Sequence, residues 1–450
     1  MADVKAFKGY RFKLGIPDDL GRHCTPPYDM IDDAMVDRFY DLHEHNVVRI
    51  IQNRREDADA ANKDRHVRAA AFLKEWVDKG VIVQDAADSV YIYRQQFTVE
   101  RGGKPVTYER TGICVLLKLV DFEEQIVLPH EYTLSGPKQD RYELMETTNA
   151  TTEQIFGLAA DGDGALYSLI SEVAASSLLK GTFTDGDGTV HSLYQCTNAA
   201  QIAKTVELMK TRSILIADGH HRYETALRFW RERQPKWFNP FTWFKDAGAF
   251  SHVMMTLVSM ADPGLVIRPF HRLVRKTGEG RTAESMINEL AKYFDMEVLG
   301  SASAAGVDNA LSADAGSGAA EVVYWDRASG ELFGLRLNAG GEEFLAGAMP
   351  EQSAAWKRLD VSKINCIIIN GILDLPLNGH VLHDIVHYVN DTSAGAKKLL
   401  EDGNDYYGGF FIRPVSINVI NDTVKGGERM PQKSTNFFPK LYSGLVFNRM

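Results

Sequence analysis

The feature that most constrains this chain is one short stretch, residues 214–224, which reads Ile-Leu-Ile-Ala-Asp-Gly-His-His-Arg-Tyr-Glu. Its apolar start predicts a short buried strand, Gly219 predicts a turn, and the residues that follow predict a helix. Such a junction brings first-turn N–H groups and the positive end of the helix dipole to the place where the polar side chains lie. The stretch therefore predicts an anion site, and phosphate is the anion that we expect there.

Four ionisable side chains crowd this junction. His220, His221 and Arg222 supply up to three cationic donors, and the Asp218 carboxylate can hold Mg²⁺ or accept a proton. The alternative is structural: Asp218 is then the helix N-cap, Gly219 eases the turn, and the histidines are exposed. Four ionisable groups crowded together add little to the stability of a fold. The pattern therefore favours a functional site.

Composition limits the class of protein. At 450 residues the chain is long enough for two or three packed units, and its 44% hydrophobic and 24% charged residues are typical of a soluble globular protein. It contains no apolar run of membrane-spanning length and no apolar segment near its first residues, so we expect a cytoplasmic protein without a membrane partner. The net charge of −10 disfavours nucleic acid as a partner. Four widely spaced cysteines indicate neither a zinc cluster nor a disulfide framework.

Residues 127–141 depart from a packing pattern, because they carry His, Glu, Thr, Lys, Asp and Arg between prolines and a glycine. We expect a loop that leads into a helix over residues 141–149, and catalytic groups often lie on such loops. Glu131 is a candidate general base, and Lys138 and Arg141 are candidate phosphate ligands. The alternative is a solvated charged loop.

The chain's last part holds a second dense signal. Lys433, Ser434 and Thr435 offer one ammonium and two hydroxyls in succession, a set that suits phosphate oxygens or Mg²⁺. The upstream glycines do not have the spacing of a P-loop. The alternative is a helix that starts here, with Ser434 or Thr435 as its N-cap.

A proline pair near the start also fixes the direction of polar groups. Pro26 and Pro27 enforce an extended backbone ahead of Tyr28 and Asp29. These two residues are candidate substrate ligands. The alternative is a rigid connector, with Asp29 capping a helix that starts near Asp32.

Strand and helix patterns alternate along the chain, which predicts a mixed α/β fold. Two alternating segments around Gly102 and Gly103 predict a hairpin. We expect strands at 46–51, 89–99, 106–110, 111–119, 154–158, 191–196, 251–260, 322–325, 332–337 and 408–413. We expect further helices at 57–80, with Gly80 as its stop, and at 166–175, 199–210 and 283–294.

Three further patterns indicate weaker candidates. His271 and Arg272 are expected to follow a strand and to reach the phosphate pocket. The aromatic segment 234–244 is either a satellite core cluster or an exposed lid or partner surface. His383 and His387 have i, i+4 spacing but lack the Glu of a zincin helix, so zinc binding is the weaker interpretation.

We predict three parts in the chain. Residues 1–277 form a catalytic, phosphate-binding core, and residues 278–348 form an appended module. The module includes a Gly/Ala/Ser-rich stretch at 301–320, expected to be loop or poorly packed helix. Residues 349–450 return to the core and contribute the Lys-Ser-Thr segment.

These motifs resemble, nearly end to end, those of the bacterial and protist family called domain of unknown function 1015. The resemblance rests on Pro26-Pro27-Tyr28-Asp29, Leu128-Pro129-His130-Glu131, Gly136-Pro137-Lys138, the segment from Ala217 to Ala226, and Met430-Pro431-Gln432-Lys433-Ser434-Thr435. The family usually has a second proline where this chain has Gln432, which loosens a backbone constraint and keeps the Lys-Ser-Thr residues in place.

The Asp-Gly-His-His-Arg core also resembles the phosphate-binding turn of the ParB/sulfiredoxin superfamily, which includes nucleotide-binding partition proteins, sulfiredoxins and free-serine kinases. The resemblance implies a ParB/sulfiredoxin-like core within the mixed α/β fold. It implies that Asp218 holds Mg²⁺ and that Gly219, His220, His221 and Arg222 bind donor phosphates. It further implies that Glu131 acts as base toward a serine hydroxyl, with ATP, ADP or pyrophosphate as donor.

We therefore predict a Mg²⁺-dependent phosphotransferase that acts on a small hydroxyl substrate, with free L-serine as the best candidate. Glu131, Asp218 and His221 are its predicted catalytic residues. His130 and Thr133 join Tyr28 and Asp29 as predicted substrate ligands. The alternatives are a nucleotide-binding ParB-like regulator and a metal-dependent phosphohydrolase or nuclease. A homodimer is compatible with each of these functions.

Overall fold

The chain divides into two compact units. The computed structural model describes residues 1–14, 20–56, 59, 62–101, 104–133, 135–233, 250–276, 283–312, 319–376, 380–402 and 405–450. The first unit comprises Met1–Pro129, Thr133–Val266 and Pro439–Met450, and the second comprises His130–Tyr132 and Ile267–Phe438. Residues 278–348, expected to be an appended module, belong to the second unit together with the chain from 349 to 438. The last twelve residues return to the first unit.

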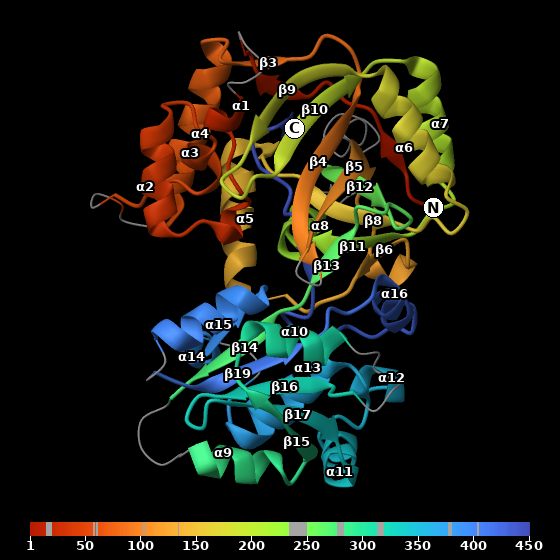
Figure 1. Cartoon of the computed structure of the whole chain (residues 1–450). Helices are drawn as coiled ribbons and strands as arrows, with labels where there is room; N and C mark the ends of the chain where they lie inside the picture. Colours follow the sequence, from red (N-terminus) through yellow and green to blue (C-terminus); the bar gives the residue numbers. More distant parts are fainter. Residues whose placement is uncertain are drawn as a thin grey trace. The chain divides into compact units, whose positions relative to one another are not determined.

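A nine-stranded sheet forms the centre of the first unit (Figure 1). Its order is β6-β11-β8-β12-β5-β4-β10-β9, with β1 paired to β5. The strands are β1 (Val4–Lys5), β4 (Val90–Arg101), β5 (Lys104–Lys118), β6 (Val127–Pro129), β8 (Ile155–Ala159), β9 (Leu178–Thr184), β10 (Val190–Cys196), β11 (Ile214–Asp218) and β12 (His252–Ser259). The β6–β11 and β8–β12 pairs are parallel, and the others are antiparallel.

Helices flank this sheet, with α6 and α7 on one side and α2 to α4 on the other in the view of Figure 1. Helix α5 packs against α8 and shares a core cluster with α6. The helices of the first unit are α1 (Leu20–His23), α2 (Asp33–Leu42), α3 (Val48–Ile51), α4 (Asn62–Asp78), α5 (Ser135–Thr148), α6 (Ala165–Ser176), α7 (Ala199–Met209) and α8 (His220–Arg233). Short 3₁₀ turns span Tyr28–Met30 and Phe122–Glu124, and the two-stranded pairs are β2 (Tyr10–Phe12) with β3 (Ile82–Gln84) and β7 (Ala150–Thr151) with β21 (Asn448–Arg449).

The core of the first unit explains why its central strands read as continuous apolar runs. The β8 and β12 strands are buried over almost their whole length, since both faces of the sheet are covered. Their side chains join those of β5, α6 and α8 in one cluster of buried residues. This cluster fixes β11 and α8, and with them the turn at Gly219.

The second unit has its own six-stranded sheet, of order β15-β17-β16-β19-β14-β18. Its strands are β14 (His271–Arg275), β15 (Phe294–Ser301), β16 (Val322–Asp326), β17 (Glu331–Leu337), β18 (Val386–Val389) and β19 (Tyr406–Ile412). A separate pair joins β13 (Val266–Arg268), at the unit boundary, to β20 (Asn436–Phe438). The helices of the second unit are α9 (Ala283–Leu290), α10 (Ala304–Ser312), α11 (Ala339–Ala348), α12 (Ala354–Lys357), α13 (Asp360–Lys363), a π-helix (Ile364–Ile372), α14 (His380–Ile385), α15 (Thr392–Glu401) and α16 (Ile417–Lys425).

The structure confirms the mixed α/β fold and most of the expected elements, including the antiparallel pair β4–β5 and the strand–turn–helix at residues 214–224. Helix α4 ends before Gly80, which has a φ of 68°. Residues 102–103, at the tip of the hairpin, and the aromatic segment 234–244 lie outside the described residues. Strand β9 was not expected.

Several boundaries were wrong. The expected strand at 46–51 is helix α3, because Asn46 bonds the N–H of Val48 and the carbonyl of Arg22 and so turns the chain. The segments 106–110 and 111–119 form one strand, β5. Helix α9 ends at Leu290, and Phe294 begins β15. Part of the low-complexity stretch forms α10, whose Val307 is buried.

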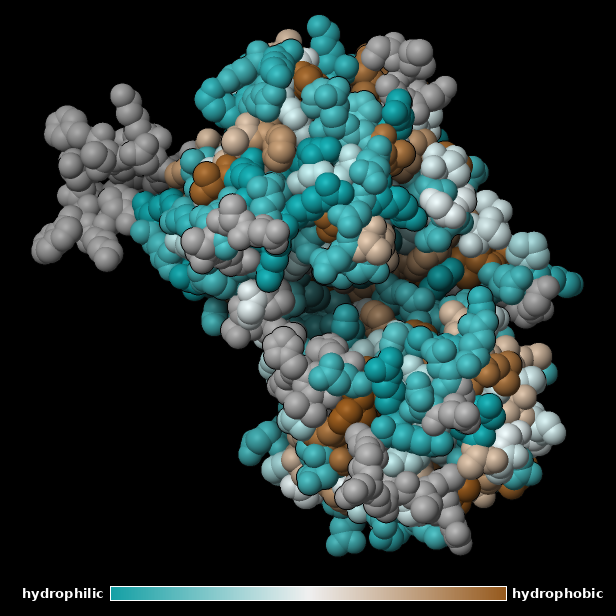
Figure 2. Space-filling view, turned by 90° about the vertical axis from the view of Figure 1, so that its left-hand side faces the viewer, coloured by the Kyte–Doolittle hydropathy of each residue, from teal (hydrophilic) through white to brown (hydrophobic). Residues whose placement is uncertain are grey.

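Among the described residues, none of the helices combines the length and apolar character that a membrane span requires. Figure 2 shows a face that is mainly hydrophilic, with hydrophobic residues scattered among polar ones. Scattered apolar side chains of this kind are ordinary on the surface of a folded protein.

Two glycines test the packing of the first sheet. A Cβ added to Gly157, in β8, would lie 2.6 Å from Met255 Sδ and 2.9 Å from Leu257 Cδ2, whereas one added to Gly162 would meet nothing within 4 Å. We expect Gly157→Ala to lower the free energy of unfolding by about 1–3 kcal/mol, because the packed side chains of Met255 and Leu257 must move. The control Gly162→Ala should stay within about 0.5 kcal/mol of the parent. Urea unfolding followed by circular dichroism measures both, and equal values for the two variants would contradict this packing.

Candidate functional site

The junction between β11 and α8 carries the candidate site of the first unit. Gly219 has a φ of 91°, in the left-handed region, and a Cβ there would lie 2.9 Å from Arg222 Nε. A side chain at this position would therefore be strained and crowded. Glycine lets the chain turn sharply from a buried strand into a 14-residue helix, whose Tyr223 is anchored by its hydroxyl on the carbonyl of Val120.

Asp218 lies between two cations. Its Oδ2 accepts a bond from Arg222 at 2.6 Å, and its Oδ1 accepts one from the Lys440 ammonium at 2.5 Å. Burial alone would raise the pKa of Asp218, but Lys440 and Arg222 outweigh burial and hold that pKa below its ordinary value. Asp218 is therefore a permanent anion near neutral pH. The structural alternative, in which Asp218 only caps the helix, does not account for its two side-chain partners.

Arg222 is engaged inside the unit. Its side chain is buried, and besides Asp218 it donates to the carbonyl of Gln154. The sequence predicted Arg222 as a phosphate ligand, and that role stays a prediction. The observed contacts give it a second task, which is to orient the Asp218 carboxylate.

Lys440 was not singled out from the sequence. It lies in the C-terminal segment 439–443, which is held by polar groups of the first unit. Arg110 donates to the carbonyl of Pro439, Gln95 donates to that of Lys440, and Gln154 donates to that of Tyr442. The backbone N–H of Tyr442 in turn donates to the Tyr93 hydroxyl. A lysine after a proline is too weak a sequence signal to predict this placement.

His220 and His221 open α8, and both are half-buried. Burial lowers the pKa of His221, and Lys138 and Arg222 lower it further, against the opposing effect of Glu224 and Asp29. The imidazole of His221 is therefore mainly neutral at pH 7, so it can accept a proton or a hydrogen bond.

Lys138 lies beside Glu224 of α8. Its ammonium is 2.8 Å from Glu224 Oε2 and 3.0 Å from the Thr133 hydroxyl, and Thr133 also donates to Glu224 at 2.8 Å. The expected loop is shorter than predicted, because α5 already begins at Ser135. Lys138 is therefore a helical residue, and its position is fixed by the packing of α5 against α8.

Arg141 is buried, and its guanidinium is committed to internal partners. It bonds the carbonyl of Ile51, pairs with Glu153 and Asp140, and lies 3.9 Å from the centre of the Tyr28 ring. Glu153 also accepts the backbone N–H of Tyr28. These contacts assign Arg141 to the support of the Pro-Pro-Tyr-Asp turn, and its role as a phosphate ligand stays a prediction. Asp29, beside Tyr28, is exposed.

The second unit brings together the other predicted residues. Glu131 Oε1 accepts bonds from the backbone N–H groups of Ser434 and Thr435, at 3.1 and 3.2 Å, and from the Thr435 hydroxyl at 3.3 Å. His130 Nε2 is 2.7 Å from the same hydroxyl. No helix starts here, contrary to the alternative, because the segment leads into β20. The Glu131 carboxylate instead organises the Lys-Ser-Thr backbone.

Lys433 is exposed and has a φ of 57°, a left-handed conformation that is uncommon for a residue other than glycine. Arg272 holds this conformation by donating to the Lys433 carbonyl at 3.0 Å. His271 and Arg272 follow strand β13, as expected, and they open the next strand, β14. Burial, with the nearby Arg272, lowers the pKa of His271 to about 3, so this histidine is neutral.

Clusters of metal-ligating side chains were expected only weakly from the sequence. Within the described part of the chain, no group of three or more His, Cys, Asp and Glu side chains has the geometry to hold a metal ion. His383 belongs to α14 and His387 to β18, so the two histidines do not share a helix face as their spacing suggested.

The electrostatic environment of His221 gives a direct test of the site. Because Glu224 and Asp29 raise its pKa against burial, we expect Glu224→Gln and Asp29→Asn each to lower the pKa of His221 further. The measurement is a titration of the His221 ring by ¹H–¹³C NMR, with Asp187→Asn as a control that leaves this pKa unchanged. A His221 pKa of 6.5 or higher in the parent protein would contradict the described environment.

Solved structures offer a limited comparison. A free serine kinase in complex with AMP is 10% identical, with a TM-score of 0.35, and the match covers 72% of this chain and 86% of that one. A conserved hypothetical protein from Pyrococcus furiosus is 13% identical, with a TM-score of 0.33 and coverage of 73% and 93%. SbnI with C-terminal truncation from Staphylococcus aureus is 11% identical, with a TM-score of 0.34 and coverage of 72% and 85%. These likenesses are too weak to support a functional argument.

Proteins of curated function give no match to the chain. A family model gives a clear one. The model described as protein of unknown function (DUF1015) matches residues 4–362, which is most of the chain. The protein therefore belongs to the DUF1015 family, as its sequence motifs predicted.

Proposed function

We propose that the protein is a phosphotransferase that moves a phosphoryl group from a nucleotide or pyrophosphate to a small hydroxyl substrate, with free L-serine as the first candidate. The observation that carries the proposal is the opening of α8. There, two half-buried histidines follow a glycine turn, beside a carboxylate that is shared by Arg222 and Lys440.

Phosphate binding follows from the charges around this turn. Lys440 and Lys138 bring ammonium groups to the first unit's cluster, and the first-turn N–H groups of α8 add the positive end of a helix. His220 and His221 supply ring N–H donors. Phosphoryl transfer requires mainly positioned positive charge, so this set suits a polyphosphate donor.

Asp218 is our candidate ligand for Mg²⁺. Each of its oxygens accepts one hydrogen bond from a cation. A carboxylate oxygen has a second lone pair, which can bind a metal ion. Mg²⁺ commonly uses one or two carboxylates together with phosphate oxygens and water, so a single aspartate fits a metal that arrives with the donor. The ion would neutralise charge on the phosphates.

Glu131 is our candidate base toward the acceptor hydroxyl. Three hydrogen bonds to its Oε1 fix the orientation of the carboxylate, and a general base must be positioned in this way. The acceptor class stays a proposal. The predicted ligands of the acceptor molecule remain Tyr28, Asp29, His130 and Thr133.

The reaction is tested by incubating the purified protein with L-serine, Mg²⁺ and ATP, ADP or pyrophosphate in turn. Phosphoserine detected by mass spectrometry supports the proposal. Release of inorganic phosphate without serine indicates a phosphohydrolase, and nucleotide binding without turnover indicates a ParB-like regulator.

We expect Asp218→Asn and His221→Ala each to reduce kcat/KM by about 100-fold or more, because each removes a group that contacts the transferring phosphate or its metal. The matched control is Arg228→Gln, an exposed residue of the same helix, which should keep parental activity. Circular dichroism must confirm that all three variants are folded. Full activity in the first two would remove the site assignment.

Lys440 gives a separate prediction, because it was identified from the structure alone. We expect Lys440→Met to raise the KM for the donor about tenfold or more, as a charge-assisted contact to phosphate is lost. A second readout is binding of inorganic phosphate, which should raise the NMR-measured pKa of His221 in the parent and do so more weakly in this variant. An unchanged KM together with an unchanged phosphate response would show that Lys440 has only a structural role.

A further inference from the structure

The first unit contains a cavity that lies outside the residues of the proposed phosphotransferase site. Its volume is about 750 Å³, within the usual range for small-molecule pockets. Its lining includes Arg22, Cys24, Arg38, Phe39, Phe183 and Tyr442. None of these residues belongs to the Asp218 cluster or to the Lys-Ser-Thr segment. We call this cavity the Phe183 pocket.

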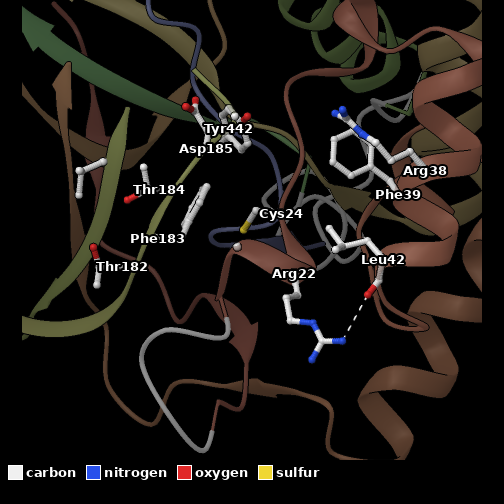
Figure 3. Close-up of a pocket in the computed structure, with 13 residues that line it drawn as sticks. Arg22, Cys24, Arg38, Phe39, Leu42, Thr182, Phe183, Thr184, Asp185 and Tyr442 are labelled. Carbon is white, nitrogen blue, oxygen red and sulfur yellow. Dashed lines mark hydrogen bonds between the residues drawn. The ribbon is translucent and has the colours of Figure 1, made fainter. Parts of the chain in front are cut away.

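Aromatic rings form two walls of the Phe183 pocket. Figure 3 shows Phe183 and Tyr442 on one side and Phe39 and Leu42 on the other, with Cys24 between them. The centres of the Phe183 and Tyr442 rings are 5.4 Å apart. Opposed apolar walls of this kind favour a flat ring system, which gains dispersion contacts on both of its faces.

The charged side chains at the pocket differ in how far other groups of the protein already bind them. Arg22 and Arg38 are both exposed. The Arg22 guanidinium donates to the carbonyl of Leu42 at 3.4 Å, whereas the Arg38 guanidinium lies over the Phe39 ring at 5.1 Å from its centre. No carboxylate of the described residues forms an ion pair with Arg38. An arginine beside an aromatic ring is well suited to a planar anionic group such as a carboxylate or sulfonate.

The one carboxylate in the lining is already satisfied by the protein. Asp185 Oδ1 accepts the backbone N–H groups of Asp187 and Thr189, both at 2.9 Å. Its Oδ2 is 3.0 Å from His191 Nε2. The negative charge of Asp185 is thus held by the turn after β9 and by a buried histidine, and not by Arg38.

Buried contacts hold the aromatic wall in place. The His191 ring stacks on Phe183, with centres 4.6 Å apart, and its Nδ1 accepts a bond from the Tyr93 hydroxyl at 2.6 Å. The same hydroxyl accepts the backbone N–H of Tyr442. The pocket is therefore pre-formed, and a ligand would lose little free energy in ordering it.

We propose that the Phe183 pocket is a binding site for a small aromatic anion, a molecule with a flat ring system and one carboxylate or sulfonate group. The rings of Phe39, Phe183 and Tyr442 contact its flat body, and Arg38 binds its anionic group.

The test uses a matched pair of fluorescent probes. The first is 1-anilinonaphthalene-8-sulfonate, an aromatic anion, and the second is N-phenyl-1-naphthylamine, its neutral counterpart. We expect the sulfonate to bind the full-length protein saturably at one site, about threefold or more tighter than the neutral probe, because only the sulfonate pairs with an arginine.

Two surface variants locate the binding. Thr184→Trp places a large side chain at an exposed position of the lining and should abolish the saturable sulfonate signal. Arg38→Gln should weaken sulfonate binding about threefold or more and leave binding of the neutral probe unchanged. The control is Arg55→Gln, an exposed arginine outside the lining, which should bind as the parent does.

Each outcome is decisive once circular dichroism shows parental folding. Saturable binding that survives Thr184→Trp places the probe elsewhere and overturns the site. Binding that Thr184→Trp abolishes but that is equal for both probes, and insensitive to Arg38→Gln, overturns the anion selectivity that defines the ligand class. Neither result bears on phosphoserine formation, so the proposed phosphotransferase activity stands or fails separately.

Discussion

The pairing of Asp218 with Arg222 and Lys440 is the interaction on which the candidate site of the first unit depends. Moving a charge out of water costs several kcal/mol, and only close partners offset that cost. Asp218 has one close cation on each oxygen, and Arg222 has a second acceptor in the carbonyl of Gln154. Loss of one partner would leave a partly buried charge without one of its two close counter-ions. The orientation of the Asp218 carboxylate therefore depends on both cations.

This pairing also explains why the last residues return to the first unit. Residues 439–443 contribute little regular structure, and they are held by donors on β4, β5 and the segment before β8. The guanidinium of Arg110 is the most costly of these to bury, and burial lowers the pKa of Arg110 to about 10. It is retained in the core because it bonds the Pro439 carbonyl and Gln95. A polar framework, and not apolar burial alone, therefore sets the position of Lys440.

Local patterns predicted much of this architecture. The strand–turn–helix at residues 214–224 could be predicted because its signal is contained in eleven consecutive residues. The same holds for the β4–β5 hairpin and for the stop of α4 at Gly80. The wrong prediction of a strand at 46–51 arose because Val and Ile favour strands when only local propensity is considered. In the structure the Asn46 side chain bonds the backbone, and the chain turns into a helix instead. Helix α5 begins at Ser135 because Pro137 needs no N–H partner in a first turn.

Local sequence patterns could not predict contacts between residues that lie far apart in the chain. Glu131 and Thr435 are 304 positions apart, and Lys440 lies 222 positions beyond Asp218. The sequence identified Glu131 and Thr435 by their chemistry but gave no reason to join them. It did not identify Lys440 at all, because one lysine among fifty basic residues has no distinguishing neighbours. Residues 278–348 were separated by composition, whereas backbone pairing of β16 with β19 joins them to the later chain.

The partners of Asp218 favour one of the two roles that the sequence left open for it. A carboxylate that is held by two permanent cations has a lowered pKa, so it is a poor proton acceptor near neutral pH. The role of metal ligand is the one that such an anion can fill. A proton acceptor must then be a different group, and Glu131 is the residue proposed for that role. Burial keeps His221 mainly neutral three residues after Asp218, so its ring can donate one hydrogen bond and accept another, as a phosphate contact in this site would require.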